Sequence, residues 1–466
     1  MRRRPVQDVS RRAFLQRASA VGFVGAAAPW ALNLAALGEA AAASAIDYKA
    51  VVCVFLAGGN DHANTLVPFS PTAHALYESL RPALAYGRGE LEATALTALE
   101  PARDREGSPC DYALAPELLP LMPLWRQRRL ATLLNIGPLV QPTTKAQYTA
   151  RSVPLPPKLF SHNDQQSVWQ SSLPEGATSG WGGRMGDLFE AGNGRSTFTC
   201  VNVSGNAVFL AGRSAVQYQV SSGGSVALNA IRAPLFGSSE ASSALRSLVT
   251  APRAHLMEAE LTRVMERAIG AHEVLGSAMA AERPLATVFP ANNSLAAQLG
   301  MVARMIGAAD ALLARRQVFF VSLGGFDTHS ALTATHPGLL GKLAAALAAF
   351  QQALDEMNLS SQVTTFTASD FGRTLAANND GSDHGWGSMH LVLGGAVEGG
   401  RHYGTAPVLA NDGPDDVGRG RLLPTTSVDQ LAATLGSWMG LSNSQLLDVL
   451  PNLGRWDAAR RNLGML

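Results

Sequence analysis

Short apolar runs alternate with long amphipathic stretches along this chain, and this alternation narrows the choice of fold more than any other pattern in the sequence. Six runs rich in Val, Ile, Leu and Phe are typical of buried strands, at residues 48–56, 129–136, 196–203, 317–323, 362–367 and 389–393. Helical patterns occupy residues 254–280, 294–315, 338–357 and 428–439. Strands that are apolar throughout and alternate with helices indicate a mostly parallel sheet covered on both faces. We therefore predict an α/β fold in which residues 46–466 form one domain that carries insertions.

The first 45 residues have the features of an export signal. Three arginines follow the initial Met, a pair stands at Arg11 and Arg12 before Phe14, and a mildly apolar stretch covers residues 18–37. The small residues Ala-Ser-Ala at 43–45 fit a cleavage site. This order predicts a cleaved twin-arginine signal, with the twin-arginine translocase as a partner and a periplasmic or secreted location. The alternative is a chance Arg-Arg pair in front of an apolar helix.

The charge and cysteine content exclude several classes of protein. The whole chain has a formal net charge of +1, and the predicted signal carries six Arg and two acidic residues, so subtracting its +4 leaves the mature part near −3. A chain this close to neutrality is not expected to bind nucleic acid or an anionic membrane surface. No later stretch has 18 uncharged apolar residues, so no transmembrane anchor is expected after cleavage. Cys53, Cys110 and Cys200 allow at most one disulfide, and without a CxxC pair a cysteine zinc site is not expected.

Acidic and imidazole side chains follow several of the predicted strands. Asp61 follows the first strand, Asp327 and His329 follow the fourth, and Asp370 follows the fifth, with His384 a little later. Because the carboxyl ends of parallel strands meet at one edge of the sheet, these side chains should lie close together. Crowded carboxylates repel one another, and a divalent cation, zinc or manganese for this mixture of Asp and His, would relieve the repulsion. The alternative is that each acid only caps the helix after its strand.

The segment LFSHNDQQ at residues 159–166 precedes a predicted helix. Ser161 at the start of that helix is a candidate nucleophile, because free backbone N–H groups and a nearby metal would stabilise its developing negative charge. His162 beside it is a candidate proton donor or metal ligand. The alternative is an ordinary capping box, with Ser161 as the cap and Asp164 three residues later.

Four further residues are candidates for contacts with a substrate. Arg373 could hold an anionic oxygen with two parallel hydrogen bonds, or it could simply pair with Asp370. Asn60 and Asn64 flank the first acid and could orient a substrate, and Asp383, next to His384, is assigned the same role.

Several motifs together resemble those of a family of exported bacterial proteins that is catalogued only as a domain of unknown function. They are the twin-arginine signal, GGND at 58–61, FSHNDQQSVWQ at 160–170, GGFDTH at 324–329, SDFGRT at 369–374 and DGSDHGWGS at 380–388. That family is distantly similar to the alkaline phosphatase, sulfatase and phosphomutase superfamily. The similarity implies a three-layer α/β/α sandwich, two metal ions, and a Ser or Thr nucleophile at the start of a helix.

The resemblance also implies a role for each matching residue. Ser161 would be the nucleophile, and the ligands would be Asp61 after the first strand, Asp327 and His329 on one ion, Asp370 between the ions or on the second, and His384 as the late histidine. The chain departs from the superfamily in three ways: Asp327 and His329 stand closer than usual, Phe371 occupies a place that often holds His or Asn, and Ser161 lies farther after the first acid than in the compact members. No Cys/Ser-x-Pro-x-Arg motif is present, so a formylglycine sulfatase is not expected.

These observations predict an exported, metal-dependent hydrolase that acts on phosphate or sulfate esters, with a small anionic ester or an envelope polysaccharide as substrate. One alternative is an envelope binding protein that keeps the fold but has lost part of the metal site. Another is a metal-free serine hydrolase that uses Ser161, although the chain has no G-x-S-x-G motif.

Overall fold

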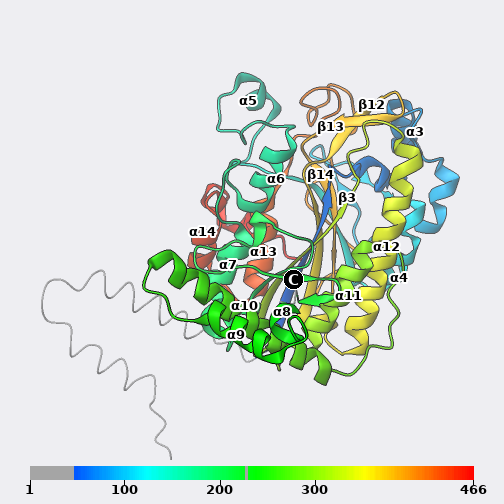
Figure 1. Ribbon diagram of the computed structural model, residues 1–466. Coiled ribbons are helices and arrows are strands. Elements are labelled where there is room, and N and C mark those ends of the chain that lie inside the picture. The colour runs from blue at the N-terminus through cyan, green and yellow to red at the C-terminus, as the bar shows by residue number, and fades with distance from the viewer. Residues whose placement is uncertain (1–46, 226–228) are drawn as a thin grey trace, which may run out of the picture. The chain divides into compact units, whose positions relative to one another are not determined.

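A mixed, mostly parallel sheet forms the centre of the protein in the computed structural model, which describes residues 47–225 and 229–466 (Figure 1). Its strands lie in the order β15 (His402–Tyr403), β6 (Leu130–Gly137), β14 (Ser388–Leu393), β11 (Val363–Ser369), β1 (Lys49–Ala57), β10 (Arg316–Gly324), β7 (Cys200–Asn202), β8 (Tyr218–Ser221) and β9 (Gly224–Ser225), and β16 (Thr426–Ser427) pairs with β6. Only β14, against β11 and β6, and β9, against β8, run antiparallel to a neighbour.

Both faces of the sheet are apolar, which explains the continuous hydrophobic runs of the sequence. Along β1, Val52, Val54 and Leu56 belong to one core cluster, and alternate residues such as Cys53 and Phe55 belong to another. Two separate cores on opposite faces of one sheet require a layer of helices on each side. The structure therefore confirms the predicted α/β fold with covered faces.

Helices supply these two outer layers (Figure 1). The first core cluster is closed by α10 (Leu256–Ala281), α11 (Ser294–Gly307) and α12 (Leu332–Glu356), and the second by α6 (His162–Ser171), α7 (Trp181–Phe189), α13 (Val428–Trp438) and α14 (Asn443–Val449). The remaining helices are α3 (Pro71–Leu80), α4 (Met122–Arg126), α5 (Lys145–Ala150), α8 (Asn229–Arg232) and α9 (Ser239–Thr250). Of the predicted strands, the one at 196–203 is shortened to β7 because Ser196–Phe198 forms a 3-10 turn.

The carboxyl ends of the central parallel strands lie at one edge of the sheet. β1 pairs with β10 up to Ala57 opposite Gly324, and with β11 up to Leu56 opposite Ser369. A hairpin formed by β12 (Arg373–Asn378) and β13 (Gly381–His384) lies over this edge, and α6 begins there (Figure 1). Two other small hairpins, β2 (Leu66–Pro68) with β5 (Tyr112–Leu114) and β3 (Ala102–Arg103) with β4 (Pro109–Cys110), complete the strands.

The remaining sequence predictions concern the ends of the chain and its cysteines. Residues Ile46–Leu466 form one compact unit, and the predicted signal at 1–45 lies outside the described residues. Within the described ranges, no helix has the length and apolar character needed to cross a membrane. Cys53, Cys110 and Cys200 are all free thiols, and burial raises the pKa of Cys53 well above its usual value.

Candidate metal centre

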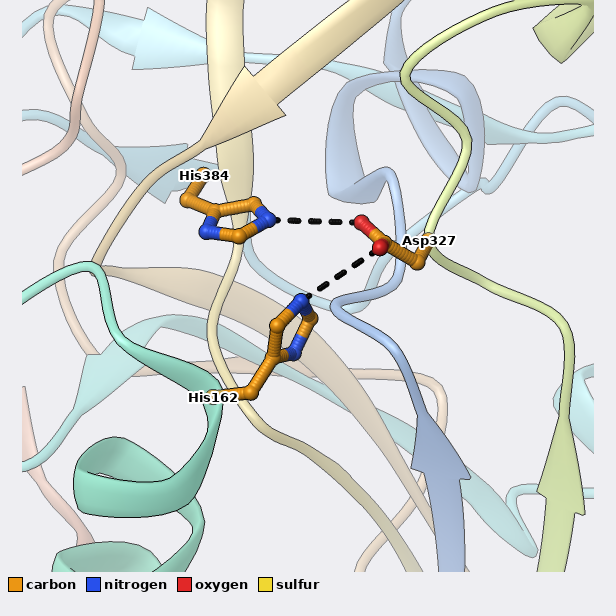
Figure 2. Close-up of side chains that lie close together, drawn as sticks. All are labelled: His162, Asp327 and His384. Carbon is orange, nitrogen blue, oxygen red and sulfur yellow. Dashed lines mark hydrogen bonds and ion pairs between the residues drawn. The ribbon is translucent and has the colours of Figure 1, made fainter.

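Two imidazoles and a carboxylate face one another beyond the carboxyl edge of the sheet. Nε2 of His162 lies 3.5 Å from Oδ2 of Asp327, and Nε2 of His384 lies 3.3 Å from Oδ1 of the same carboxylate (Figure 2). One ligand atom from each of the three residues falls within 4.8 Å of the other two. The three residues come from the first turn of α6, the loop after β10 and the end of β13, so the fold brings together segments that are far apart in the sequence.

His329 adds a third imidazole to this group. Its Nε2 lies 3.2 Å from Oδ1 of Asp327 and 2.8 Å from Nε2 of His384. We call His162, Asp327, His329 and His384 the His–Asp cluster. Its side chains range from about a fifth to a half exposed, so the cluster can be reached from solvent.

The outer nitrogen of each ring has an oxygen acceptor. Nδ1 of His162 lies 2.6 Å from Oδ2 of Asp370, Nδ1 of His384 lies 2.8 Å from the carbonyl of Phe160, and Nδ1 of His329 lies 3.3 Å from Oδ1 of Asp383. Metal-binding histidines almost always donate this second N–H to a carboxylate or a backbone carbonyl, which leaves the other nitrogen free to bind. The arrangement therefore turns three Nε2 lone pairs toward Asp327.

The Nε2 atoms of His329 and His384 lie so close that their lone pairs would repel each other unless a proton or a cation lies between them. When Nδ1 carries the ring proton in both His329 and His384, their Nε2 atoms confront each other as acceptors at 2.8 Å. A cation shared by both nitrogens, or an additional proton, removes the repulsion. A cation also satisfies the carboxylate of Asp327.

The distances from Asp327 to the three Nε2 atoms fit a tetrahedral ion better than hydrogen bonds. A charge-assisted N–H···O bond is usually about 2.7–2.9 Å long, whereas Asp327 lies 3.2–3.5 Å from the three Nε2 atoms. Ligands about 2.0–2.1 Å from a tetrahedral zinc ion are about 3.3 Å from one another. The ligand atoms of His162, Asp327 and His384, which lie within 4.8 Å of one another, therefore suit one divalent cation. His329 can join them as a fourth ligand only after its ring moves away from His384 and toward His162.

The electrostatics favour the ligand forms of two of these residues. Burial lowers the pKa of His384, and the nearby His162 and Arg373 charges lower it further, so its imidazole is held neutral. Burial acts to raise the pKa of Asp327, but the hydrogen bond and charge of Arg373, with His329 and His162, bring it below its usual value. The pKa of His162 is raised, mainly by its hydrogen bond to Asp370.

Asp370 supports the cluster from behind. It is fully buried, and its Oδ1 accepts from the backbone N–H of Gly58 at 3.0 Å. Its Oδ2 accepts from His162 and, at 2.8 Å, from Nε2 of Gln166. The sequence prediction made Asp370 a metal ligand, but its oxygens are already engaged, and the geometry makes it the carboxylate that orients His162.

Arg373 and Asp383 also position cluster residues. Arg373 is fully buried, donates through Nε and Nη2 to the carbonyl of Ser382, and reaches Asp327 through Nη1 at 3.0 Å. Asp383 accepts from His329 and pairs with Arg419 at 3.1 Å. The predicted substrate contacts of Arg373 and Asp383 are therefore replaced by contacts within the protein.

The structure places Asp61 away from the cluster. Asp61 is fully buried, where its Oδ2 pairs with Arg81 and accepts from Ser382, and its Oδ1 caps the short helix at His62–Asn64. Burial acts to raise the pKa of Asp61, but the charge of Arg81 holds it well below its usual range. The expectation that Asp61 binds metal is thus corrected to a buried ion pair.

The two predicted substrate amides belong to the same buried region. Asn60 accepts from Nε2 of His336 at 2.9 Å and donates to Thr65. Asn64 donates to the carbonyl of Leu84 and accepts from the hydroxyl of Tyr77. Both side chains are almost completely buried, so neither can contact a substrate in this arrangement.

Ser161 directly precedes His162 of the cluster in the sequence. It is the N-cap residue of α6, but its side chain makes no capping bond and instead donates to Oδ2 of Asp164 at 2.9 Å. Phe160 before it has a positive φ of 74°, a conformation that is uncommon for a bulky residue. Strain of this kind often marks functional sites, and here Phe160 also supplies the carbonyl that orients His384.

Sequence reasoning did not single out Gln166 or Phe371 as neighbours of the cluster. Gln166 stands one helical turn after His162, and this i, i+4 spacing was a signal that could have found it. The ring of Phe371 packs 4.8 Å from that of His162 and 4.6 Å from that of His384, centroid to centroid. An apolar wall therefore lies where the superfamily resemblance implied a further polar ligand, and the described residues bring together one metal-ligand group only.

Comparison with known proteins gives a family and a set of distant structures. The family model described as "Protein of unknown function (DUF1501)" matches residues 48–456, which confirms the predicted family. No curated protein sequence matches the chain.

Among solved structures, similar chains include Ps i-CgsB in complex with k-i-k-neocarrahexaose, with 11% identity, 87% of this chain and 76% of that chain covered, and a TM-score of 0.34. Another is the lipoteichoic acid synthase LtaP from Listeria monocytogenes, with 8% identity, 87% and 78% of the two chains covered, and a TM-score of 0.31. A third is a mutant of the alkaline phosphatase PafA, with 10% identity, 71% and 64% covered, and a TM-score of 0.27. At these TM-scores the function has to be argued from the site itself.

Proposed function

The chain belongs to the DUF1501 family, and from the geometry of its His–Asp cluster we propose that it is a metal-dependent hydrolase of phosphate or sulfate esters, exported by means of the signal pattern at residues 1–45. One observation carries the proposal: three imidazoles, each oriented through Nδ1, turn Nε2 toward the single carboxylate of Asp327. This donor set suits zinc better than manganese, since nitrogen ligands and tetrahedral spacing are typical of zinc.

A divalent cation at such a site would act as a Lewis acid on an ester oxygen. The residues of the chain would hold that cation and position the nucleophile. Asp370 and the carbonyl of Phe160 fix the rings of His162 and His384, and Arg373 fixes Asp327. Because this framework is largely buried, the ligands would need little reorganisation during turnover.

Ser161 is the proposed nucleophile. Its hydroxyl proton already points to Asp164, a buried carboxylate that Lys158 approaches to 3.5 Å, so Asp164 can accept that proton as the bond to phosphorus or sulfur forms. Free N–H groups in the first turn of α6 stabilise the negative charge on the transferred group. Asp164 then passes this proton to the oxygen of the leaving alcohol. In the second step Asp164 takes a proton from the attacking water and returns it to the Ser161 oxygen as the serine ester is cleaved.

A binding protein without catalysis is the second candidate, and Phe371 is the observation that favours it. Its ring covers His162 and His384, and the described residues do not assemble the second metal site implied by the superfamily resemblance. A protein of this kind would hold one metal and an anionic group without cleaving it.

Replacing Ser161 with Ala tests the enzyme against the binder. We expect the Ser161→Ala protein, purified after export, to lose turnover of p-nitrophenyl phosphate or p-nitrophenyl sulfate while its metal content stays unchanged. Turnover by the unchanged protein should also stop on chelation with EDTA and return on addition of zinc.

The matched control is Ser238→Ala, which removes the N-cap serine of α9 far along the chain from the cluster. The Ser238→Ala protein should keep full turnover. A loss of turnover confined to Ser161→Ala then reflects the loss of the nucleophile and not merely the removal of an N-cap serine. Full activity in Ser161→Ala would rule out the assigned nucleophile, and a stoichiometric metal without any ester turnover would favour the binding protein.

A further inference from the structure

An open groove of about 480 Å³ lies beside the first turns of α6. Its volume is within the range of small-molecule sites, about 300–1,000 Å³. It is lined by Asn163, Gln166 and Gln170, which share one face of α6, and by Ser204 and Asn206 from the segment after β7. Ser322 near the end of β10 also lines it.

The groove adjoins the His–Asp cluster through α6. Asn163 directly follows His162, and Gln166 donates to the same oxygen of Asp370 that holds His162. A molecule whose ester group lies at Asp327 would therefore extend past the start of α6 into this groove.

The lining of the groove is polar but almost uncharged. Amide and hydroxyl side chains dominate it, the only charged side chain is Glu175 at 51% exposure, and no Lys or Arg contributes. Among the described residues, the side chains of Asn163 and Ser322 make no hydrogen bond within the protein, so their polar groups remain available to a ligand. Glu175 pairs with the exposed Lys158 at 3.7 Å, so a polyanionic ligand would find no unpaired positive charge among the described residues that line the groove.

The groove also offers a small apolar surface. Ala57, Ala177 and Val208 line it and are partly exposed, whereas Phe55 and Phe320 lie beneath them at 3% and 4% exposure. Amides, hydroxyls and this small apolar surface together match a ligand that has both hydroxyl groups and C–H faces, which is the surface of a sugar ring.

We propose that this groove binds the neutral carbohydrate portion of the substrate, while the single phosphate or sulfate ester on that carbohydrate lies at the His–Asp cluster. The inference rests on the proposed function for the position of the ester, whereas the groove itself is defined by its own residues. The substrate class is thus a sugar carrying one ester group, and polyanions are disfavoured.

Filling the groove provides the test. Ala177 lines its rim, and the Ala177→Trp variant of the exported protein places an indole in the space. The probes are neutral methyl hexopyranosides of gluco, galacto and manno configuration, followed by saturation-transfer NMR, which needs no catalysis. At least one glycoside should show saturation transfer with the unchanged protein and lose it in Ala177→Trp, at unchanged metal content. The matched control is Ala268→Trp, an exposed alanine on α10, which should behave as the unchanged protein.

Turnover provides the second measurement. For the hexose 6-phosphate or 6-sulfate of the same configuration, Ala177→Trp should raise KM about tenfold, the equivalent of one or two lost hydrogen bonds, with little change for the p-nitrophenyl ester. The groove assignment is overturned if the unchanged protein binds no glycoside or if Ala177→Trp still binds it. It is also overturned if Ala177→Trp raises KM equally for the sugar ester and the p-nitrophenyl ester. If no ester is cleaved but Ala177→Trp abolishes glycoside binding, the proposed hydrolase fails and the carbohydrate groove stands.

Discussion

The His384→Ala protein is expected to lose its bound divalent cation and about 10²–10³-fold or more of its kcat on ester substrates. His384 holds a central place in the cluster, since its Nε2 faces both Asp327 and His329 and its Nδ1 is fixed by the carbonyl of Phe160. Replacing residues that only orient metal ligands commonly lowers metal affinity 10–100-fold, so removal of a ligand should lower it at least as much. Elemental analysis by mass spectrometry and steady-state kinetics measure the two effects.

The matched control is His255→Ala, which removes an exposed histidine from the start of α10. It should retain metal and activity, so a loss confined to His384→Ala reflects the cluster. A His384→Ala protein that keeps one tightly bound cation and full kcat would show that the metal, if present, lies elsewhere.

The Arg81→Met protein is expected to unfold with a free energy about 3–5 kcal/mol lower than that of the unchanged protein. Arg81 and Asp61 are both completely buried, and removal of the arginine leaves the carboxylate without its partner. Met preserves most of the volume of the side chain, so the lost charge dominates the effect. Chemical denaturation followed by tryptophan fluorescence measures the difference.

The loss of unfolding free energy in Arg81→Met should depend on pH. Because the pKa of Asp61 is held below its usual value in the folded protein, the pair stabilises the fold above the usual pKa of Asp, and this contribution is lost as the pH falls below it. In Arg81→Met, burial without a partner raises the pKa of Asp61, so the deficit is largest at neutral pH and shrinks in acid.

The double variant Arg81→Met, Asp61→Asn is the control for the lost charge. It should recover most of the lost stability, because no buried charge remains without a partner. Equal unfolding free energies for Arg81→Met and the unchanged protein would contradict the assignment of Asp61 to a structural ion pair.

The fold and part of the cluster could be predicted from the sequence because they depend on pattern. Apolar runs along β1, β10 and β11 identify buried parallel strands, and residues that follow such strands must lie near one edge of the sheet. Asp327, His329 and His384 were predicted on that ground, and they do come together.

The direction of each side chain could not be predicted in the same way. Asp61 and Asp370 also follow strands, but Asp61 turns to Arg81, twenty residues later, and Asp370 turns to His162 on another segment. Arg373 resembled a substrate-binding residue, but burial against the carbonyls of Ser382 and Gly58 consumes its donors. Sequence position thus identifies the edge where polar residues gather, while tertiary partners decide which of them face the open site.

Anomalous X-ray scattering from crystals of the exported protein, recorded at the absorption edge of the metal found by elemental analysis, tests the central claim most directly. We expect one strong peak about 2.0–2.2 Å from Nε2 of His162, His329 and His384 and from a carboxylate oxygen of Asp327. A map without a peak among these four side chains, from protein never exposed to chelator, would contradict it.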